Sequence, residues 1–253
     1  MPDPTEVRAI PVRGIPEIGR RADLAAEILD ACARQGDPLS AGDILVVTHK
    51  VVSKAEGRFA QLAKVRPSKK ATAWARKHGV DARVIELALQ QANRLVRMTK
   101  GVLITETRHH LICANSGVDV SNVDGGASAV LLPADPDRSA ARLLSVIRRK
   151  AGLHVPVIIT DTFGRPWREG LTEVAIGLAG MKATRDFRDQ RDPYGYKLHV
   201  SLEAVADSLA AFAGTVCGKL SRCPACIIRG FAYEPGRGRA RDLIRPARRD
   251  LFR

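Results

Sequence analysis

The sequence predicts a single domain in which helices and strands alternate, an α/β or α+β fold rather than a bundle or a sandwich. Three observations support this fold class. Apolar residues recur at helical spacing in several segments of the 253-residue chain, and short runs rich in Val and Ile lie between those segments. No repeat or flexible linker divides residues 1–253, although two lobes could meet near residues 101–126.

The first predicted helix covers residues 21–36 and ends on Gly36, a frequent helix terminator. A buried strand follows at residues 44–47 and runs into a polar segment with two lysines. The next predicted elements are helices at 67–79 and 81–97 and paired strands at 101–107 and 110–115. The remaining ones are helices at 136–152 and 201–218 and strands at 155–160 and 225–230.

The formal charge is +14, with seven arginines and two aspartates in the final segment GRGRARDLIRPARRDLFR. This balance suits an anionic partner, either nucleic acid or a phosphorylated small molecule. Aromatic residues make up only 4% of the chain, too few for a base-stacking platform, and no nucleic-acid module is recognisable. We therefore expect no nucleic-acid partner, while a basic nucleic-acid-binding protein stays the main alternative from another class.

The N-terminus lacks the apolar region of a secretory signal, and no apolar run reaches the roughly 20 residues that span a bilayer. We expect a cytoplasmic protein with reduced thiols and no membrane partner. Cys223 and Cys226 form a lone C-x-x-C motif, and Cys217 adds a third sulfur. Small hydrophobic packing is the favoured interpretation, and a zinc site is the alternative.

Two segments could bind an anion. The turn GIPEIGR, residues 14–20, precedes a helix and could offer backbone N–H groups, although a plain capping turn explains it equally well. The segment THKVVSKAEGR follows a strand and could bring Lys50 and Lys54 to one site, where each ammonium group would neutralise phosphate. A solvated lysine pair is the alternative.

Two aspartates follow apolar runs, Asp119 in GVDVSN and Asp161 in ITDTFGRPWREG. Carboxylates with a threonine hydroxyl and an asparagine amide form an all-oxygen set, which favours Mg²⁺ or Mn²⁺ bridging phosphates. Helix caps or Asx turns would also use such aspartates. Because no protein nucleophile with its own base is evident, these features together predict a nucleotide-dependent transferase or ligase.

The sequence resembles the coenzyme F-420:L-glutamate ligases, also called F-420-0 gamma-glutamyl ligases. The resemblance covers nearly the whole chain and runs through GIPEIG, GDILVVTHKVVSKAEGR, ICANSGVDVSNV, LLPADPDRSA, VIITDTFGRPWREG, VAIGLAG and RDLIRPARRDLFR. It implies an α+β fold in two lobes, an intertwined homodimer, and GTP-dependent addition of L-glutamate to the deazaflavin precursor through an acyl phosphate, with further γ-linked glutamates. It also implies Mg²⁺ or Mn²⁺, one or two ions, with K⁺ as an additional candidate.

The resemblance also implies roles for individual residues. The implied catalytic residues are Asp161 and Lys54, and the implied metal ligands are Asp119, Asp161 and Thr162. The implied GTP-binding residues are Ile15, Pro16, Glu17, Ile18, His49, Lys50, Lys54, Asn122, Gly218 and Lys219. Arg165, Trp167 and Arg168 are the expected contacts of the anionic, aromatic acceptor.

The chain departs from the family pattern at a few positions. Lys219 stands where the family often has a metal-binding glutamine, and an ammonium group cannot coordinate a metal. Gln90 and Gln91 replace an acidic pair. These departures keep open a divergent ligase of the same fold with another acceptor or amino acid.

Overall fold

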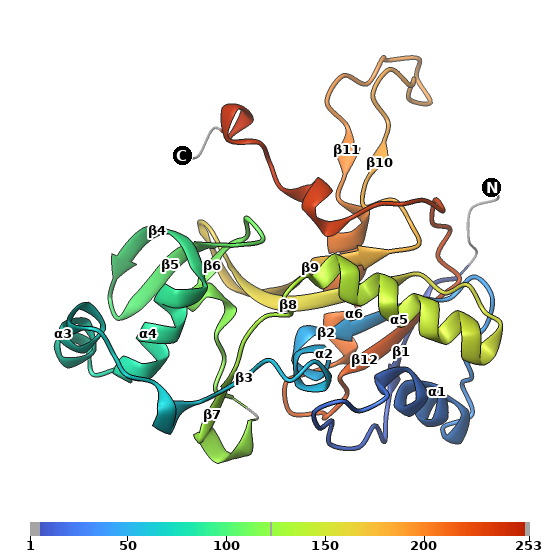
Figure 1. Cartoon of the computed structure of the whole chain (residues 1–253). Coiled ribbons are helices and arrows are strands. Elements are labelled where there is room, and N and C mark those ends of the chain that lie inside the picture. Colours follow the sequence, from blue (N-terminus) through green and yellow to red (C-terminus); the bar gives the residue numbers. More distant parts are fainter. Residues whose placement is uncertain (1–5, 122, 251–253) are drawn as a thin grey trace.

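The computed structural model describes residues 6–121 and 123–250, and its centre is a five-stranded mixed sheet in the order β1-β12-β2-β8-β9 (Figure 1). β2 and β8 are parallel, and the other neighbours are antiparallel. The strands are β1 (Arg8–Val12), β2 (Ile44–Thr48), β8 (Val157–Arg165), β9 (Arg168–Ala179) and β12 (Ala225–Arg229). β2 and the first part of β8 are buried on both faces, which explains their continuous apolar sequences.

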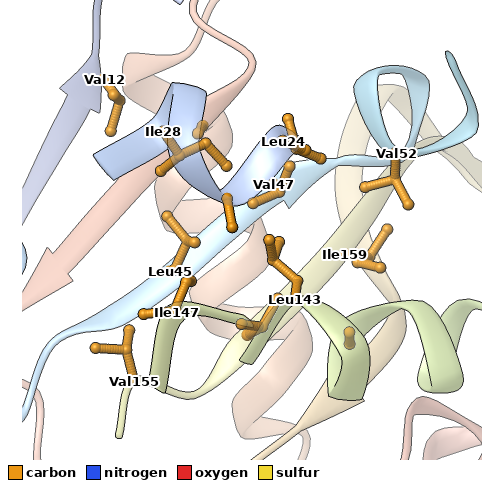
Figure 2. Close-up of a cluster of buried hydrophobic side chains, with 14 of the residues drawn as sticks. Val12, Leu24, Ile28, Leu45, Val47, Val52, Leu143, Ile147, Val155 and Ile159 are labelled. Atoms are coloured by element: carbon orange, nitrogen blue, oxygen red, sulfur yellow. The ribbon is translucent and has the colours of Figure 1, made fainter. Parts of the chain in front are cut away.

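Helices cover both faces of this sheet. α1 (Leu24–Arg34) and α5 (Pro136–Ala151) pack on one face, and α6 (Val205–Val216) packs on the other. Figure 2 shows the first core, in which Ile28 of α1 and Ile147 of α5 meet Leu45 and Ile159 of the sheet. Burial of these side chains supplies the main stabilisation of the sheet.

Local signals fix the ends of the helices. The Asp135 side chain accepts a hydrogen bond from the Arg138 amide at the start of α5, where Pro136 occupies the first turn. Gly152 follows the last residue of α5 with φ +70°, in the left-handed conformation that glycine adopts without strain. The predicted helix 136–152 is therefore confirmed to within a residue at its end.

Residues 59–131, called here the outer segment, form a separate group of elements with its own core (Figure 1). β3 (Phe59–Gln61) and β7 (Ser128–Val130) pair as an antiparallel ribbon at its base. Its remaining helices and strands are α3 (Lys69–His78), α4 (Ala82–Gln91), β4 (Ala92–Thr99), β5 (Val102–Thr107) and β6 (Ile112–Ala114). Its core includes Leu62, Ile85, Leu103, Val118 and Leu131.

The short elements complete the described chain. They are α2 (His49–Ala55), the protruding strand pair β10 (Arg185–Asp186) and β11 (Leu202–Glu203), and the 3-10 helices η1 (Leu62–Lys64), η2 (Asn115–Gly117), η3 (Asp124–Gly126), η4 (Ala240–Leu243) and η5 (Ala247–Arg249). Within the described ranges, every helix is too short or too polar to cross a lipid bilayer. The predicted mixed α+β class is confirmed, whereas the two-lobed division and the homodimer stay predictions.

Three predicted elements were wrong in extent. The helix predicted at 201–218 begins only at Val205, because Leu202 and Glu203 pair with β10 as strand β11. The helix predicted at 81–97 ends at Gln91, and the chain continues as β4, which pairs with β5. Tertiary pairing overrides the helical pattern there. The strand predicted at 155–160 continues to Arg165 and turns back as β9, so that β8 and β9 form a long hairpin.

Candidate functional site

Four segments leave the central sheet at the same edge. The pairing register places Val12 of β1 and Val47 of β2 beside Ala225, the first residue of β12. It also places Thr48, at the end of β2, beside Thr160 of β8. The turn after β1, helix α2, the loop before β12 and the outer part of β8 therefore start from one edge. This edge carries most of the predicted site residues: Ile15, Pro16, Glu17, Ile18, His49, Lys50, Lys54, Asp161, Thr162, Gly218 and Lys219.

Helix α2 directs three basic side chains to different partners. Lys50 Nζ lies 2.8 Å from Asp119 Oδ2 and 2.8 Å from the Ser121 hydroxyl oxygen. Lys54, one helical turn later, forms an ion pair with Glu17. The Lys50 contact joins α2 to the outer segment, and the Lys54 contact joins it to the turn after β1. The predicted pair of ammonium groups therefore lies on one helix facing two carboxylates.

His49 connects α2 to β8. Its ring is buried, and its Nε2 atom lies 3.3 Å from Asp161 Oδ1. The other ring nitrogen, Nδ1, is buried without a hydrogen-bond partner in the described structure. Asp161 is 15% exposed and also accepts a hydrogen bond from the Thr162 amide at 2.7 Å. His49 and Asp161 thus form a largely buried pair, and the chain places Asp161 next to α2 as the predicted site requires.

Asp119 is held in its charged form. Burial alone would raise its pKa, but hydrogen bonds from Lys50 and from the Ser121 amide and hydroxyl outweigh burial, so the pKa lies below its ordinary value. The backbone of Asp119 is fixed as well, because its N–H and C=O both bond to Val130 of β7. Asp119 is therefore a rigid, ionised carboxylate near neutral pH.

The position of Asp161 and Thr162 within β8 differs from the prediction. Both were expected at the end of a strand, but the strand continues because β9 pairs with it through Arg165. The pairing puts Thr162 opposite Glu173, and the Thr162 hydroxyl donates a hydrogen bond to the Glu173 carboxylate. Sequence reasoning missed Glu173. The signal would have been a hairpin centred on Pro166 and Trp167, whose register brings Glu173 to this position.

The turn after β1 is anchored by its apolar residues. Ile18 is buried in the first core and Ile15 packs against it, while Pro16 and Glu17 are exposed. The Arg20 side chain lies over Gly57, where an added Cβ would come within 2.9 Å of its Nε atom. The turn is therefore docked on the end of α2 with its polar groups outward.

A polar pocket of about 610 Å³ opens beside this turn. Glu17 and Lys54 line it, together with residues that sequence reasoning gave no role, chiefly Arg20, Lys64 and Asp124. Arg20 falls within the quoted GIPEIGR motif, so its basic character was the available signal. The pocket has the size and the mixed charges to accept a polar small molecule.

Other predicted residues do not line this pocket, and one of them lies outside the described chain. Gly218 and Lys219 belong to the loop between α6 and β12, and the Thr48 amide bonds to the Pro224 carbonyl at the end of that loop. Arg165, Trp167 and Arg168 lie at the tip of the β8–β9 hairpin, with Trp167 80% exposed. At about 3.3 Å per strand residue the tip begins roughly 13 Å beyond Asp161. Asn122 lies outside the described residues.

The oxygen donors present fit a divalent ion only with help from a ligand. Asp119, Asp161 and Thr162 offer the hard oxygen atoms that Mg²⁺ and Mn²⁺ prefer. In the part of the chain that the structure describes, no group of three or more His, Cys, Asp or Glu side chains could hold a metal by itself. This fits Mg²⁺ sites in which one or two carboxylates act with substrate phosphates. The same finding gives no support to a zinc site at Cys217, Cys223 and Cys226, which are free thiols.

Fold and site together define an α+β protein in which strongly charged side chains gather at one edge of a mixed sheet. Comparison with known sequences identifies its family. Residues 14–230 match the family F420-0:Gamma-glutamyl ligase. The chain belongs to this family.

Three relatives carry the name coenzyme F420:L-glutamate ligase. The protein from Methanothermobacter thermautotrophicus is 40% identical over 98% of this chain and 99% of its own length. The protein from Methanopyrus kandleri is 43% identical over 92% of this chain and 93% of its own length. The one from Methanocaldococcus jannaschii is 41% identical over 85% of this chain and 86% of its own length. The predicted family is confirmed across almost the full sequence.

Proposed function

We propose that the chain is a GTP-dependent ligase that joins L-glutamate to the carboxylate of the deazaflavin F420 precursor and then adds further γ-linked glutamates. The names of the relatives support the acceptor and the amino acid. The structural observation that carries the proposal is the meeting of α2, Asp119 and Asp161 at one edge, beside a polar pocket.

Amide formation from a carboxylate requires activation, because a carboxylate oxygen cannot leave the carbonyl carbon as an oxide ion. The γ-phosphoryl group of GTP moves to the carboxylate oxygen, which gives an acyl phosphate and GDP. The neutral amino group of glutamate then attacks the carbonyl carbon, the C–N bond forms, inorganic phosphate leaves with the C–O electrons, and the nitrogen loses a proton to solvent. Phosphoryl transfer depends on positioning and charge neutralisation more than on a protein nucleophile.

The basic residues of α2 suit the nucleotide phosphates. In the free protein Lys50 pairs with Asp119 and Lys54 pairs with Glu17. Glu17 is 83% exposed, so phosphate oxygens can replace its carboxylate on Lys54 at little desolvation cost. The backbone of residues 15–18, His49, Gly218 and Lys219 would complete the GTP site, with Asn122 as a further contact.

Asp119, Asp161 and Thr162 would hold the divalent ion or ions, which supply charge neutralisation at the γ-phosphate, with K⁺ as an additional ion. Asp161 and Lys54 act closest to the transferred group in this proposal. His49 keeps the Asp161 side chain in one orientation, because it contacts Oδ1 from a buried position. Glu173 orients the Thr162 hydroxyl. Arg165, Trp167 and Arg168 would meet the anionic acceptor as it lies along the β8–β9 hairpin.

The proposal includes a homodimer. The β10–β11 arm projects from the body of the protein (Figure 1) and exposes Tyr194, Tyr196 and Val200 at 97%, 65% and 89%. Exposed aromatic and aliphatic side chains on an otherwise charged arm suit an interface with a second copy. Light scattering after gel filtration is expected to give twice the mass of one chain, and a monomer at micromolar concentration would remove this part of the proposal.

A ligation assay followed by mass spectrometry tests the activity. Protein is mixed with the unglutamylated precursor, L-glutamate, Mg²⁺ or Mn²⁺, and either GTP or ATP, with and without K⁺. Product masses raised by one or more glutamate residues, with GDP released only in the GTP reaction, are the expected result. No product with either nucleotide and either metal, from folded protein, would contradict the proposal and favour a ligase with another acceptor or amino acid. Replacing glutamate by other amino acids in the same assay distinguishes these cases.

A further inference from the structure

A second pocket lies outside the candidate site. It has a volume of about 550 Å³ and is formed by the first half of α5, the end of β9 and residues 236–241 of the arginine-rich final segment. Its basic lining consists of Arg138, Arg237, Arg239, Arg241 and His154. This hollow is called here the arginine pocket. The candidate site uses none of these five side chains.

Two glycines place the arginines of the final segment. Gly238 lies so close to the chain at residues 181–183 that an added Cβ would meet the Met181 carbonyl oxygen at 2.4 Å, and its amide bonds to the same oxygen. Gly236 is less crowded, because the nearest atom to an added Cβ is Cγ of the Lys182 side chain at 3.0 Å. Arg237 and Arg239 flank Gly238, and both line the pocket.

The floor of the arginine pocket is held by Asp137. Its Oδ1 atom accepts hydrogen bonds from the Leu178 amide of β9 at 2.9 Å and from the Ala240 amide at 2.8 Å. Burial raises the pKa of Asp137 above its ordinary value despite these two bonds. A carboxylate neutralised by neighbouring guanidinium groups would show the opposite shift. Asp137 thus fixes the final segment to the sheet without pairing with the arginines.

The arginines of this pocket have no acidic partner among the residues that the structure describes. Among residues 6–121 and 123–250, no ion pair joins Arg138, Arg237, Arg239 or Arg241 to a carboxylate. The second aspartate of the lining, Asp135, uses its Oδ1 atom to cap α5. Four guanidinium groups around one hollow repel each other, and an anion that bonds to several of them relieves this repulsion.

We propose that the arginine pocket binds a small polyanion with two or more carboxylate or phosphate groups. Leu178 pairs with Ile158, three residues before Asp161, so the pocket lies about 10 Å along β8 from the candidate site. The identity of this polyanion rests on the proposed ligase function: its carboxylates are those of the γ-linked glutamate tail of the acceptor, which extends away from the end that reacts. Phosphate groups are the other source of the same chemistry.

Calorimetric titration of the intact protein tests this proposal with two probes, tri-γ-glutamate and inorganic pyrophosphate. The test variant is Arg237→Gln with Arg239→Gln, and the matched control is Arg148→Gln with Arg149→Gln at the far end of α5. The test variant is expected to bind the preferred probe about tenfold or more weakly, because two charge-assisted contacts are lost, and the control variant to match the wild type within about twofold. Thermal unfolding checks that both variants are folded.

Each outcome either identifies the source of the anionic groups, glutamate tail or phosphate, or contradicts the proposal. Where the test variant alone weakens binding, tighter binding of tri-γ-glutamate identifies the tail as the ligand of this pocket, and tighter binding of pyrophosphate identifies a phosphate ligand. Binding of neither probe below a Kd of about 10 mM, or equal loss in test and control variants, would overturn the proposal. Probe binding that survives in a protein with no ligation activity would refute the proposed function and leave the arginine pocket in place.

Discussion

The candidate site and the arginine pocket lie along the same two strands, β8 and β9, but their charges are arranged in opposite ways. At the candidate site each basic side chain of α2 faces a carboxylate, Lys50 with Asp119, Lys54 with Glu17 and His49 with Asp161. In the arginine pocket, within the described chain, the four guanidinium groups face no carboxylate partner, and Asp137 bonds to backbone amides instead.

This difference separates two ways of preparing a site for an anion. Paired charges hold the side chains of the candidate site in place before a ligand arrives. These side chains are therefore ordered with little repulsion between like charges. Unpaired arginines leave a net positive field that attracts an anion from a distance but holds it less specifically. The first arrangement suits chemistry, which requires fixed geometry, and the second suits retention of a flexible charged ligand.

The largest expected effect is at the candidate site. Asp161→Asn removes a negative charge and leaves the shape of the side chain, so ligation activity should fall by about 100-fold or more, the range observed when one stabiliser of a charged transition state is lost. Ligated product is measured by mass spectrometry, and the midpoint of thermal unfolding is measured in parallel.

The control for this prediction is Asp30→Asn, on α1, where the aspartate is exposed. Its activity should stay within about twofold of the wild type, since surface substitutions of this kind have small effects. Full activity of Asp161→Asn would show that Asp161 takes no part in the reaction. The contrast between the two sites would then no longer hold.

Much of the candidate site could be predicted from the sequence because its residues follow short apolar strands. The Val- and Ile-rich runs before Thr48 and Asp161 indicate buried strands, and polar groups directly after them are expected to share a sheet edge. The structure confirms this convergence for α2 and Asp161. The family could be predicted because its motifs appear in order along almost the whole chain.

Other features depend on pairing between distant segments. The length of the β8–β9 hairpin, and with it the position of Glu173 opposite Thr162, follows from a register that local composition does not specify. Residues 92–97 continue the predicted helical pattern but pair with β5 as part of strand β4. The arginine pocket required Asp137 and Ala240 to meet across 103 positions of sequence, which the basic composition alone could not indicate.

A smaller effect is expected for the floor of the arginine pocket. Asp137→Ala leaves the amides of Leu178 and Ala240 without their acceptor, and the free energy of unfolding should fall by about 2 kcal/mol or more. Urea unfolding followed by circular dichroism measures this loss. Asp137→Asn keeps an oxygen acceptor and should lose less. Equal stability of Asp137→Ala and the wild type would mean that the final segment is held by other contacts.

The smallest effect concerns the pH dependence of stability, in which Asp119 and Asp137 should behave oppositely. The pKa of Asp119 is lowered from 3.8 in the folded protein, so its stabilising contribution is present above pH 3.8 and is lost as pH falls through the folded value. The pKa of Asp137 is raised from 3.8, so its contribution is present below pH 3.8 and is lost as pH rises through the folded value.

Urea unfolding between pH 3 and pH 7 of the wild type, Asp119→Asn and Asp137→Asn measures these contributions as differences in the free energy of unfolding. As the pH rises, the advantage of the wild type over Asp119→Asn should grow below pH 3.8, and its advantage over Asp137→Asn should shrink above pH 3.8. If the two differences in the free energy of unfolding change with pH in the same direction, one assignment is wrong. Either Lys50 does not hold Asp119 in its charged form, or an arginine neutralises Asp137. The second result would also place a guanidinium group on Asp137 and reduce the number available to a ligand in the arginine pocket.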